Sequence, residues 1–166
     1  MEEIVTIVDK ENNVTGHAPR SQMRSQGLIH RASYIYVFNS DRKLFVHKRV
    51  KTKDVFPGYY DLCAGGVILK DESYEVGAVR ELEEEFGIAN VPLNEHFVFY
   101  YKDDQIKVWG KVFTCTYDGE MVLQKEEIES GSFMKCEDVI KLSESQPITP
   151  DTLQVFKRLI NDPGQC

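Results

Sequence analysis

Short runs of alternating hydrophobic and polar residues recur along the chain, which is the pattern of half-buried β-strands. The runs that predict strands are 2–8, 33–38, 44–47, 59–62, 97–101, 107–117 and 128–134. Two of the gaps between them, Asn39-Ser40-Asp41 and Asp103-Asp104, are turn signals, so two pairs of consecutive strands are predicted to form antiparallel hairpins. The short run 59–62 leads into Gly65-Gly66, where we expect that strand to end.

Residues 73–86 change to a helical period, and Gly87 stands where a helix commonly ends. Two more helices are predicted to begin near Glu137 and, after Pro150, near Asp151. The polar segment 17–28 reads as a loop or a short helix crossing the fold. Because strands, hairpins and helices are mixed in this order, the sequence predicts an α/β (α+β) fold, an α/β/α sandwich around a mixed β-sheet.

Projected at about 100° per residue, the helix 73–86 separates two faces. The predicted core face carries Val76, Val79, Leu82 and Phe86. Glu81, Glu84 and Glu85 gather on the opposite face together with Gly77. Glycine weakens a helix, so we interpret Gly77 as a point where another group approaches the backbone.

The segment from Asp71 to Glu85 holds seven carboxylates and a single cation, Arg80. Crowded carboxylates raise one another's pKa values, and a divalent cation relieves that repulsion. Mg²⁺ is typically held by carboxylates, water and substrate phosphates. The alternative is an ordinary solvated face of a Glu-rich helix, and the lack of lysine partners weighs against it.

The whole chain has 166 residues with 42% hydrophobic and 28% charged residues, so we expect one globular domain over 1–166. Within it, 1–30 reads as an N-terminal strand and loop, 31–161 as the core and 162–166 as a tail. The net charge of −7 argues against a nucleic-acid duplex as partner. An acidic protein that binds a polyphosphate needs a divalent cation between the two.

No apolar run approaches the roughly 18–20 residues of a membrane span, and the start MEEIVTIVDKE lacks the basic residues of a secretory signal. We therefore expect a cytoplasmic protein without a membrane partner. The cysteines Cys63, Cys115, Cys136 and Cys166 lack zinc-like spacing, and we expect them to be reduced thiols.

The acidic helix and the glycine pair before it also match a known motif. Gly66, five residues, Glu72, seven residues, Arg80-Glu81-Leu82, one residue, Glu84-Glu85, one residue and Gly87-Ile88 resemble the Nudix box at every defined position. The motif spans 23 residues, Gly66–Ile88, and the flanking strands and final helix also resemble the Nudix fold. The resemblance implies a hydrolase that cleaves a diphosphate linkage in a nucleoside diphosphate derivative or related organic pyrophosphate, using Mg²⁺ or Mn²⁺.

Carried over position by position, the resemblance implies that the metal ligands are Glu81, Glu84, Glu85 and the Gly66 carbonyl. Glu72 and Arg80 would be architectural, with Arg80 orienting a carboxylate. The catalytic base is left open between Glu81, Glu84 and an acid outside the box, for which Glu127 is preferred to Glu126.

The stretches around 28–32 and 56–60 resemble one branch of the superfamily, the isopentenyl-diphosphate isomerases, which shift a proton across a double bond. That branch needs a cysteine directly before the box glycine, where this chain has Gly65, with Cys63 two residues earlier. Of the isomerase metal ligands only His30 is matched. The hydrolase is therefore preferred, with the isomerase or a non-catalytic nucleotide- or protein-binding Nudix module as alternatives.

Residues that select the substrate are harder to assign. Arg31, Lys48 and Arg49 are candidates for contacting phosphates, as is Arg20 or Arg24 from the segment 17–28. Tyr101 and Trp109 are candidates for stacking on a ring. Ordinary surface cations and half-buried strand aromatics are the alternative for all of them. A homodimer through the N-terminal strand is compatible with the sequence.

Overall fold

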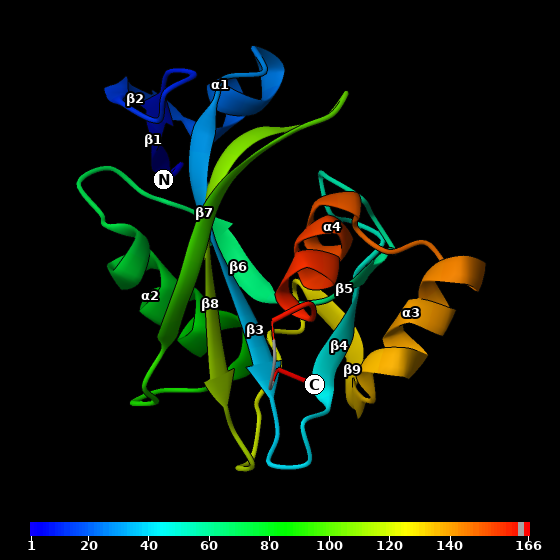
Figure 1. Cartoon of the computed structure of the whole chain (residues 1–166). Coiled ribbons are helices and arrows are strands. Elements are labelled where there is room, and N and C mark those ends of the chain that lie inside the picture. Colours follow the sequence, from blue (N-terminus) through cyan, green and yellow to red (C-terminus); the bar gives the residue numbers. More distant parts are fainter. Residues whose placement is uncertain (163–164) are drawn as a thin grey trace.

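The computed structural model describes residues 1–162 and 165–166 and is built around one mixed sheet (Figure 1). Its strands are β1 (Ile4–Val8), β2 (Val14–Pro19), β3 (His30–Phe38), β4 (Leu44–Arg49), β5 (Tyr60–Asp61), β6 (Ala64–Val67), β7 (Asn94–Lys102), β8 (Lys107–Thr116) and β9 (Ile128–Met134). Its helices are α1 (Arg20–Ser25), α2 (Tyr74–Phe86), α3 (Cys136–Ser145) and α4 (Pro150–Leu159). The predicted α+β class with a mixed sheet is confirmed.

Strand β3 is the central strand of the sheet. It pairs with β8 in parallel from His30 to Phe38 and with β6 in antiparallel register, and it touches β1 at its start. With its hairpin partner β4 it shares only the register pair Phe38↔Leu44, while β4 pairs along its length with β9. The sheet therefore opens from the β3–β4 turn into two halves (Figure 1). Two cavities are lined by residues from both halves.

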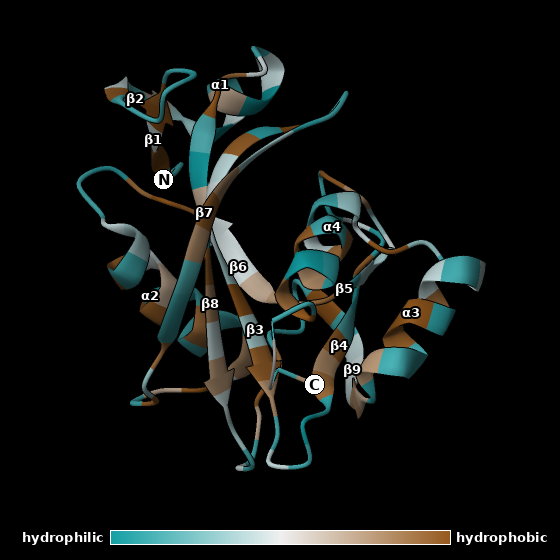
Figure 2. Ribbon diagram, in the orientation of Figure 1, coloured by the Kyte–Doolittle hydropathy of each residue, from teal (hydrophilic) through white to brown (hydrophobic). Residues whose placement is uncertain are grey.

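Alternate side chains of β3 supply two separate cores. Tyr34 and Tyr36 belong to the hydrophobic cluster that α4 covers, whereas Ile35 and Val37 belong to the cluster that α2 covers. This period of two is the reason that one strand can serve both layers of the sandwich. Figure 2 shows the central strands largely in hydrophobic colours, with hydrophilic colours on the outer surfaces of the helices.

Most predicted elements are present; β3, β4 and β7 are longer than predicted, whereas β1, β5 and β8 are shorter. The clearest difference lies in 14–19, where β2 was not predicted, whereas α1 is the short helix that was one of the two expectations for 17–28. Strand β2 is mostly exposed, so it carries no hydrophobic alternation from which a strand could be inferred. The predicted strand 59–62 corresponds to the two-residue strand β5, and a separate strand, β6, runs through Gly65-Gly66, where the strand was expected to end.

The predicted core face of α2 is partly wrong. Val76 and Val79 are 58% and 51% exposed, whereas Leu82 and Phe86 are buried as expected. The buried face also contains Gly77, Ala78 and Glu85. A methyl group on Gly77 would lie 2.5 Å from the Ile68 side chain, so this glycine lets the helix pack against its own chain and does not face a ligand. The helix presents small residues and a carboxylate to the sheet. The prediction considered hydrophobic residues alone, so it wrongly placed the two valines on the buried face.

The expectation of four reduced cysteines is wrong for one pair. Cys136, at the start of α3, forms a disulfide with Cys166, while Cys63 and Cys115 are free and buried. Sequence spacing carries no signal for this bridge because its two partners are 30 residues apart. No helix in residues 1–162 and 165–166 is long and apolar enough to cross a membrane.

The corrected face of α2 can be tested by truncation. We expect Leu82→Ala to lower the free energy of unfolding by about 2–5 kcal/mol, because its side chain is buried. Val76→Ala and Val79→Ala should change it by no more than about 0.5 kcal/mol, because both side chains are largely in solvent. Chemical denaturation of the three variants measures this. If either valine variant lost as much free energy of unfolding as Leu82→Ala, the observed orientation would be contradicted.

Candidate active site

The loop between β6 and α2 is fixed by one arginine and one glutamate. Arg80 donates from Nε to Glu72 Oε2 (2.8 Å) and from Nη2 to Glu72 Oε1 (2.9 Å), a two-pronged ion pair. Glu72 Oε1 also accepts the Leu69 backbone N–H at 3.0 Å. Burial opposes ionisation of Glu72, but Arg80 and the Leu69 amide outweigh it and lower the pKa of this carboxyl. The pair therefore joins the loop to the middle of the helix.

Two carboxylates of α2 lie directly against the glycine pair of β6. Gly65 donates its backbone N–H to Glu85 Oε1 at 2.7 Å, and Glu85 is buried. The Glu81 carboxylate lies so close to Gly66 that a side chain on Gly66 would collide with it. A side chain on Gly65 would collide with the Ser33 carbonyl oxygen of the neighbouring strand. Gly65 therefore permits the close approach of β6 to β3, and Gly66 leaves room for the Glu81 carboxylate of α2.

Burial leaves these two carboxylates with unusual acidity. It raises the pKa of Glu81 to about 7, with Glu84 adding to the rise and Arg80 opposing it. Burial also raises the pKa of Glu85 well above its usual range, and the nearby Glu81 adds to that rise. The negative charge that α2 gathers here is thus only partly compensated by the protein.

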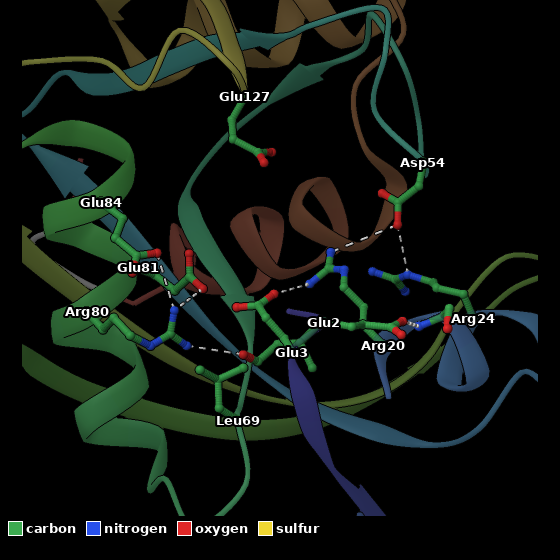
Figure 3. A network of polar contacts seen from close by, with 12 residues as sticks. Glu2, Glu3, Arg20, Arg24, Asp54, Leu69, Arg80, Glu81, Glu84 and Glu127 are labelled. Atoms are coloured by element: carbon green, nitrogen blue, oxygen red, sulfur yellow. Dashed lines mark hydrogen bonds and ion pairs between the residues drawn. The ribbon is translucent and has the colours of Figure 1, made fainter. Parts of the chain in front are cut away.

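The remaining acids complete a cleft. Arg80 Nη1 donates to Glu81 at 2.7 Å and to the exposed Glu84 at 3.4 Å. Glu127, which directly precedes β9, lies on the opposite wall and forms an ion pair with Lys53 (Figure 3). The acidic cleft, a cavity of about 460 Å³, is lined by Glu3, Arg20, Thr52, Lys53, Asp54, Gly65, Gly66, Glu81, Glu84, Glu85, Gln124, Glu126 and Glu127.

The donor set of the acidic cleft fits a hard divalent cation, because it consists of carboxylates with raised pKa values beside a glycine backbone. Within the described residues, no three His, Cys, Asp or Glu side chains are already gathered as a metal cage. The contacts explain this, since the Arg80 guanidinium engages Glu81 and Glu84 while the Gly65 amide engages Glu85. A cation would have to compete with Arg80 for two of the carboxylates.

A smaller cavity of about 120 Å³, the inner pocket, adjoins the acidic cleft. The two cavities share Arg20, Lys53, Gly65 and Gly66. The wall of the inner pocket also contains the buried Asp151, which accepts a hydrogen bond from the Tyr34 hydroxyl at 2.8 Å. Burial, with a contribution from Asp61, raises the pKa of Asp151 to about 6.

Four of the predicted substrate residues are not brought together. Arg49 lines the inner pocket, where it donates to Asp61 at 3.0 Å. Arg31 donates to Asn12. Tyr101 donates to Asp103, and Trp109 packs on Tyr100. Arg31, Tyr101 and Trp109 line neither cavity, and their role in substrate binding stays a prediction.

Several residues of the two cavities were not predicted from the sequence. They are Glu3, Lys53, Asp54, Asp61 and Asp151. Asp151 follows Pro150 and reads as an ordinary helix-start residue, and the others lie in strands or loops that only the tertiary fold brings to the box. The basic segment 17–28 was the one available signal, since Arg20 and Arg24 both line the inner pocket.

Comparison with known proteins agrees with this geometry. The family model of the NUDIX domain matches residues 28–158, and the chain belongs to the Nudix hydrolase family. It is 43% identical over 154 residues to the uncharacterized Nudix hydrolase YfcD of Escherichia coli K12, covering 93% of this chain and 84% of that protein. It is 39% identical over 155 residues to the uncharacterized Nudix hydrolase PA4841 of Pseudomonas aeruginosa, covering 93% and 92%.

Solved structures agree in fold. The crystal structure of DR0079 from Deinococcus radiodurans superposes with a TM-score of 0.82 at 19% identity, covering 94% of this chain and 98% of that one. The MutT protein from Methanosarcina mazei Go1 superposes with a TM-score of 0.68 at 22% identity, covering 81% and 96%.

The pKa of Glu81 predicts how the metal-free protein responds to pH. Because the folded state raises this pKa from 4.5 to about 7, its contribution to stability is complete below about pH 4.5 and is lost as pH rises through about 7. We expect Glu81→Gln to remove part of that decline and to be more stable than the parent at about pH 8 by roughly 1–3 kcal/mol. Denaturation in EDTA across this pH range measures it.

The matched control is Glu83→Gln, which removes the same charge from an exposed position on the same helix. It should keep the pH dependence of the parent. If Glu81→Gln behaved like Glu83→Gln, the buried carboxylate would not be the origin of the effect.

Proposed function

We propose that the protein is a Mg²⁺-dependent hydrolase that cleaves a diphosphate linkage in a nucleoside diphosphate derivative or related organic pyrophosphate; Mn²⁺ is the alternative metal. The observation that carries the proposal is the acidic cleft. Three box carboxylates from α2 and the glycine pair of β6 line one wall, and Glu127 lies on the other.

In this proposal Glu81, Glu84, Glu85 and the Gly66 carbonyl hold the metal. When bound, the cation neutralises phosphate oxygens, lowers the pKa of a water molecule and stabilises the leaving group. Glu72 keeps Arg80 in place, and Arg80 orients Glu81 and Glu84 until they bind the metal. The Gly65 N–H orients the Glu85 carboxylate.

The reaction forms a bond from a water oxygen to phosphorus and breaks the bond from phosphorus to the bridging oxygen. We assign the acceptor of the water proton to Glu127, since it faces the box carboxylates across the cleft without belonging to them. Lys53 would hold the Glu127 carboxylate in position. Glu81 and Glu84 are the alternative bases.

The isomerase alternative is disfavoured by the packing of β6. The position of the isomerase cysteine is occupied by Gly65, where a side chain has no room against Ser33. Cys63 does line the inner pocket, but burial raises the pKa of its thiol well above the usual range. His30 is buried beside the same pocket, and burial lowers its pKa to about 4.

The expected setting is a single catalytic domain in the cytoplasm acting on a small diphosphate, with neither a nucleic-acid duplex nor a membrane as partner. A homodimer through the N-terminal segment stays a prediction. Its support is that β2 is the edge strand of the order β2-β1-β3-β4-β5 and that the Val14 side chain is exposed.

The proposal predicts metal-dependent hydrolysis. With millimolar Mg²⁺ and a panel of nucleoside diphosphate derivatives plus isopentenyl diphosphate, we expect release of a phosphate-containing product from at least one diphosphate. Glu84→Gln should lower kcat by about a hundredfold or more, because a ligand of the charge-neutralising cation is lost. Mg²⁺ should also raise the melting temperature of the parent protein, and do so less in Glu84→Gln.

Glu83→Gln, at the neighbouring exposed position, serves as the control and should hydrolyse like the parent. Formation of dimethylallyl diphosphate without cleavage would replace the hydrolase with the isomerase. Tight binding of a nucleotide with no turnover of any compound would favour the binding module.

A further inference from the structure

One carboxylate, that of Asp54, stands between two arginines at the edge of the acidic cleft (Figure 3). Asp54 Oδ2 lies 3.2 Å from Arg24 Nε and 3.9 Å from Arg20 Nη2. Arg20 and Arg24 are one helical turn apart on α1, and both line the inner pocket. Asp54 comes from the loop between β4 and β5, so this contact links the N-terminal part of the chain to the second half of the sheet.

These contacts occupy few of the N–H donors of the two guanidinium groups. Across the described residues, Arg24 donates a side-chain hydrogen bond only through Nε, to Asp54. Arg20 makes none; its neighbours are the ion pairs with Asp54 and with Glu3, the latter at 3.7 Å. An arginine offers five N–H donors in a fork that suits two oxygens of a phosphate. Most of these donors have no acceptor among the described residues.

Electrostatics adds to the argument. Burial lowers the pKa of Arg24, and the like charge of Arg20 lowers it further. The inner pocket is also lined by Arg49 and Lys53, but these are engaged by Asp61 and Glu127 respectively. Asp54 thus supplies one oxygen, Oδ2, to two crowded cations, and its side chain is 47% exposed. Ion pairs with such an exposed partner are weak.

We propose that Arg20 and Arg24 form a binding site for a phosphate group of the substrate, and that Asp54 occupies this site in the free enzyme as an internal competitor. A phosphate carries more charge and more acceptor oxygens than one carboxylate, so it displaces Asp54 and engages both forks. The arrangement places metal-binding carboxylates on one side of Glu3 and phosphate-binding arginines on the other (Figure 3). The inference rests on the proposed function for the identity of the anion as a substrate phosphate.

The test uses inorganic pyrophosphate as the probe and EDTA to remove divalent cations, so it does not depend on hydrolysis. We expect calorimetric titration at low ionic strength to show that Asp54→Asn binds pyrophosphate about threefold to tenfold more tightly than the parent. Asp54→Ala should bind it more tightly as well, which removes any role of the asparagine amide. Arg24→Gln should bind about tenfold more weakly or worse.

Asp41→Asn is the matched control. It makes the same change of net charge on the β3–β4 turn, at the other end of the sheet from α1, where the Asp41 side chain is exposed (Figure 1). It should bind pyrophosphate like the parent. In Asp54→Asn combined with Arg24→Gln, the gain from the first change should largely disappear, because Asp54 is proposed to act through these arginines.

The proposal is overturned if Asp54→Asn and Asp54→Ala bind no more tightly than Asp41→Asn, or if Arg24→Gln binds like the parent. Melting temperatures of all variants separate a local change from loss of folding. Failure of this binding test with intact hydrolysis would remove the arginine site alone. Metal-free binding as expected, with no hydrolysis of any panel compound, would remove the proposed reaction and leave an anion-binding site.

Discussion

The close approach of helix α2 to the glycines of strand β6 is the constraint on which the rest of the site depends. Gly66 leaves room for the Glu81 carboxylate of α2, and Gly77 of α2 leaves room for Ile68, which follows β6. This close approach places the Glu81 and Glu85 carboxylates against the strand backbone and removes them from water. The Arg80–Glu72 pair then fixes the loop that joins the two elements. Backbone packing and the electrostatics of the cleft therefore have one structural origin.

The sequence was informative where a local rule determines the structure. Helix α2 begins after Ser73, whose side chain caps Val76, and ends at Gly87 in the left-handed region, as the terminal residues indicate. The box carboxylates were found because their spacing matches a motif. The orientation of α2 was misjudged, since Glu85 is buried by its contact with Gly65, and such a contact has no hydrophobic signature.

The other walls of the site are a product of tertiary structure. One loop supplies Lys53 and Asp54, and a second loop supplies Glu127, which is 74 residues after Lys53. Glu3 comes from the N-terminal segment. Lys53 and Glu127 meet because β4 pairs with β9 as far as Arg49 and Ile128, and the cleft is open because β3 and β4 diverge after a single register pair. A hairpin signal in sequence predicts the turn but not how far the strands stay paired, since β9 and β6 compete for the same edges.

Because the pKa of Glu81 is raised to about 7, part of the acidic face of α2 holds protons near neutral pH, and burial also raises the pKa of Glu85. Any cation that takes these carboxylates as ligands must first release the protons they hold. The heat of metal binding would then include the heat of protonating the buffer, and would differ between buffers at the same pH. The apparent metal affinity would also rise with pH, so acidification would lower the loading of the cleft with metal.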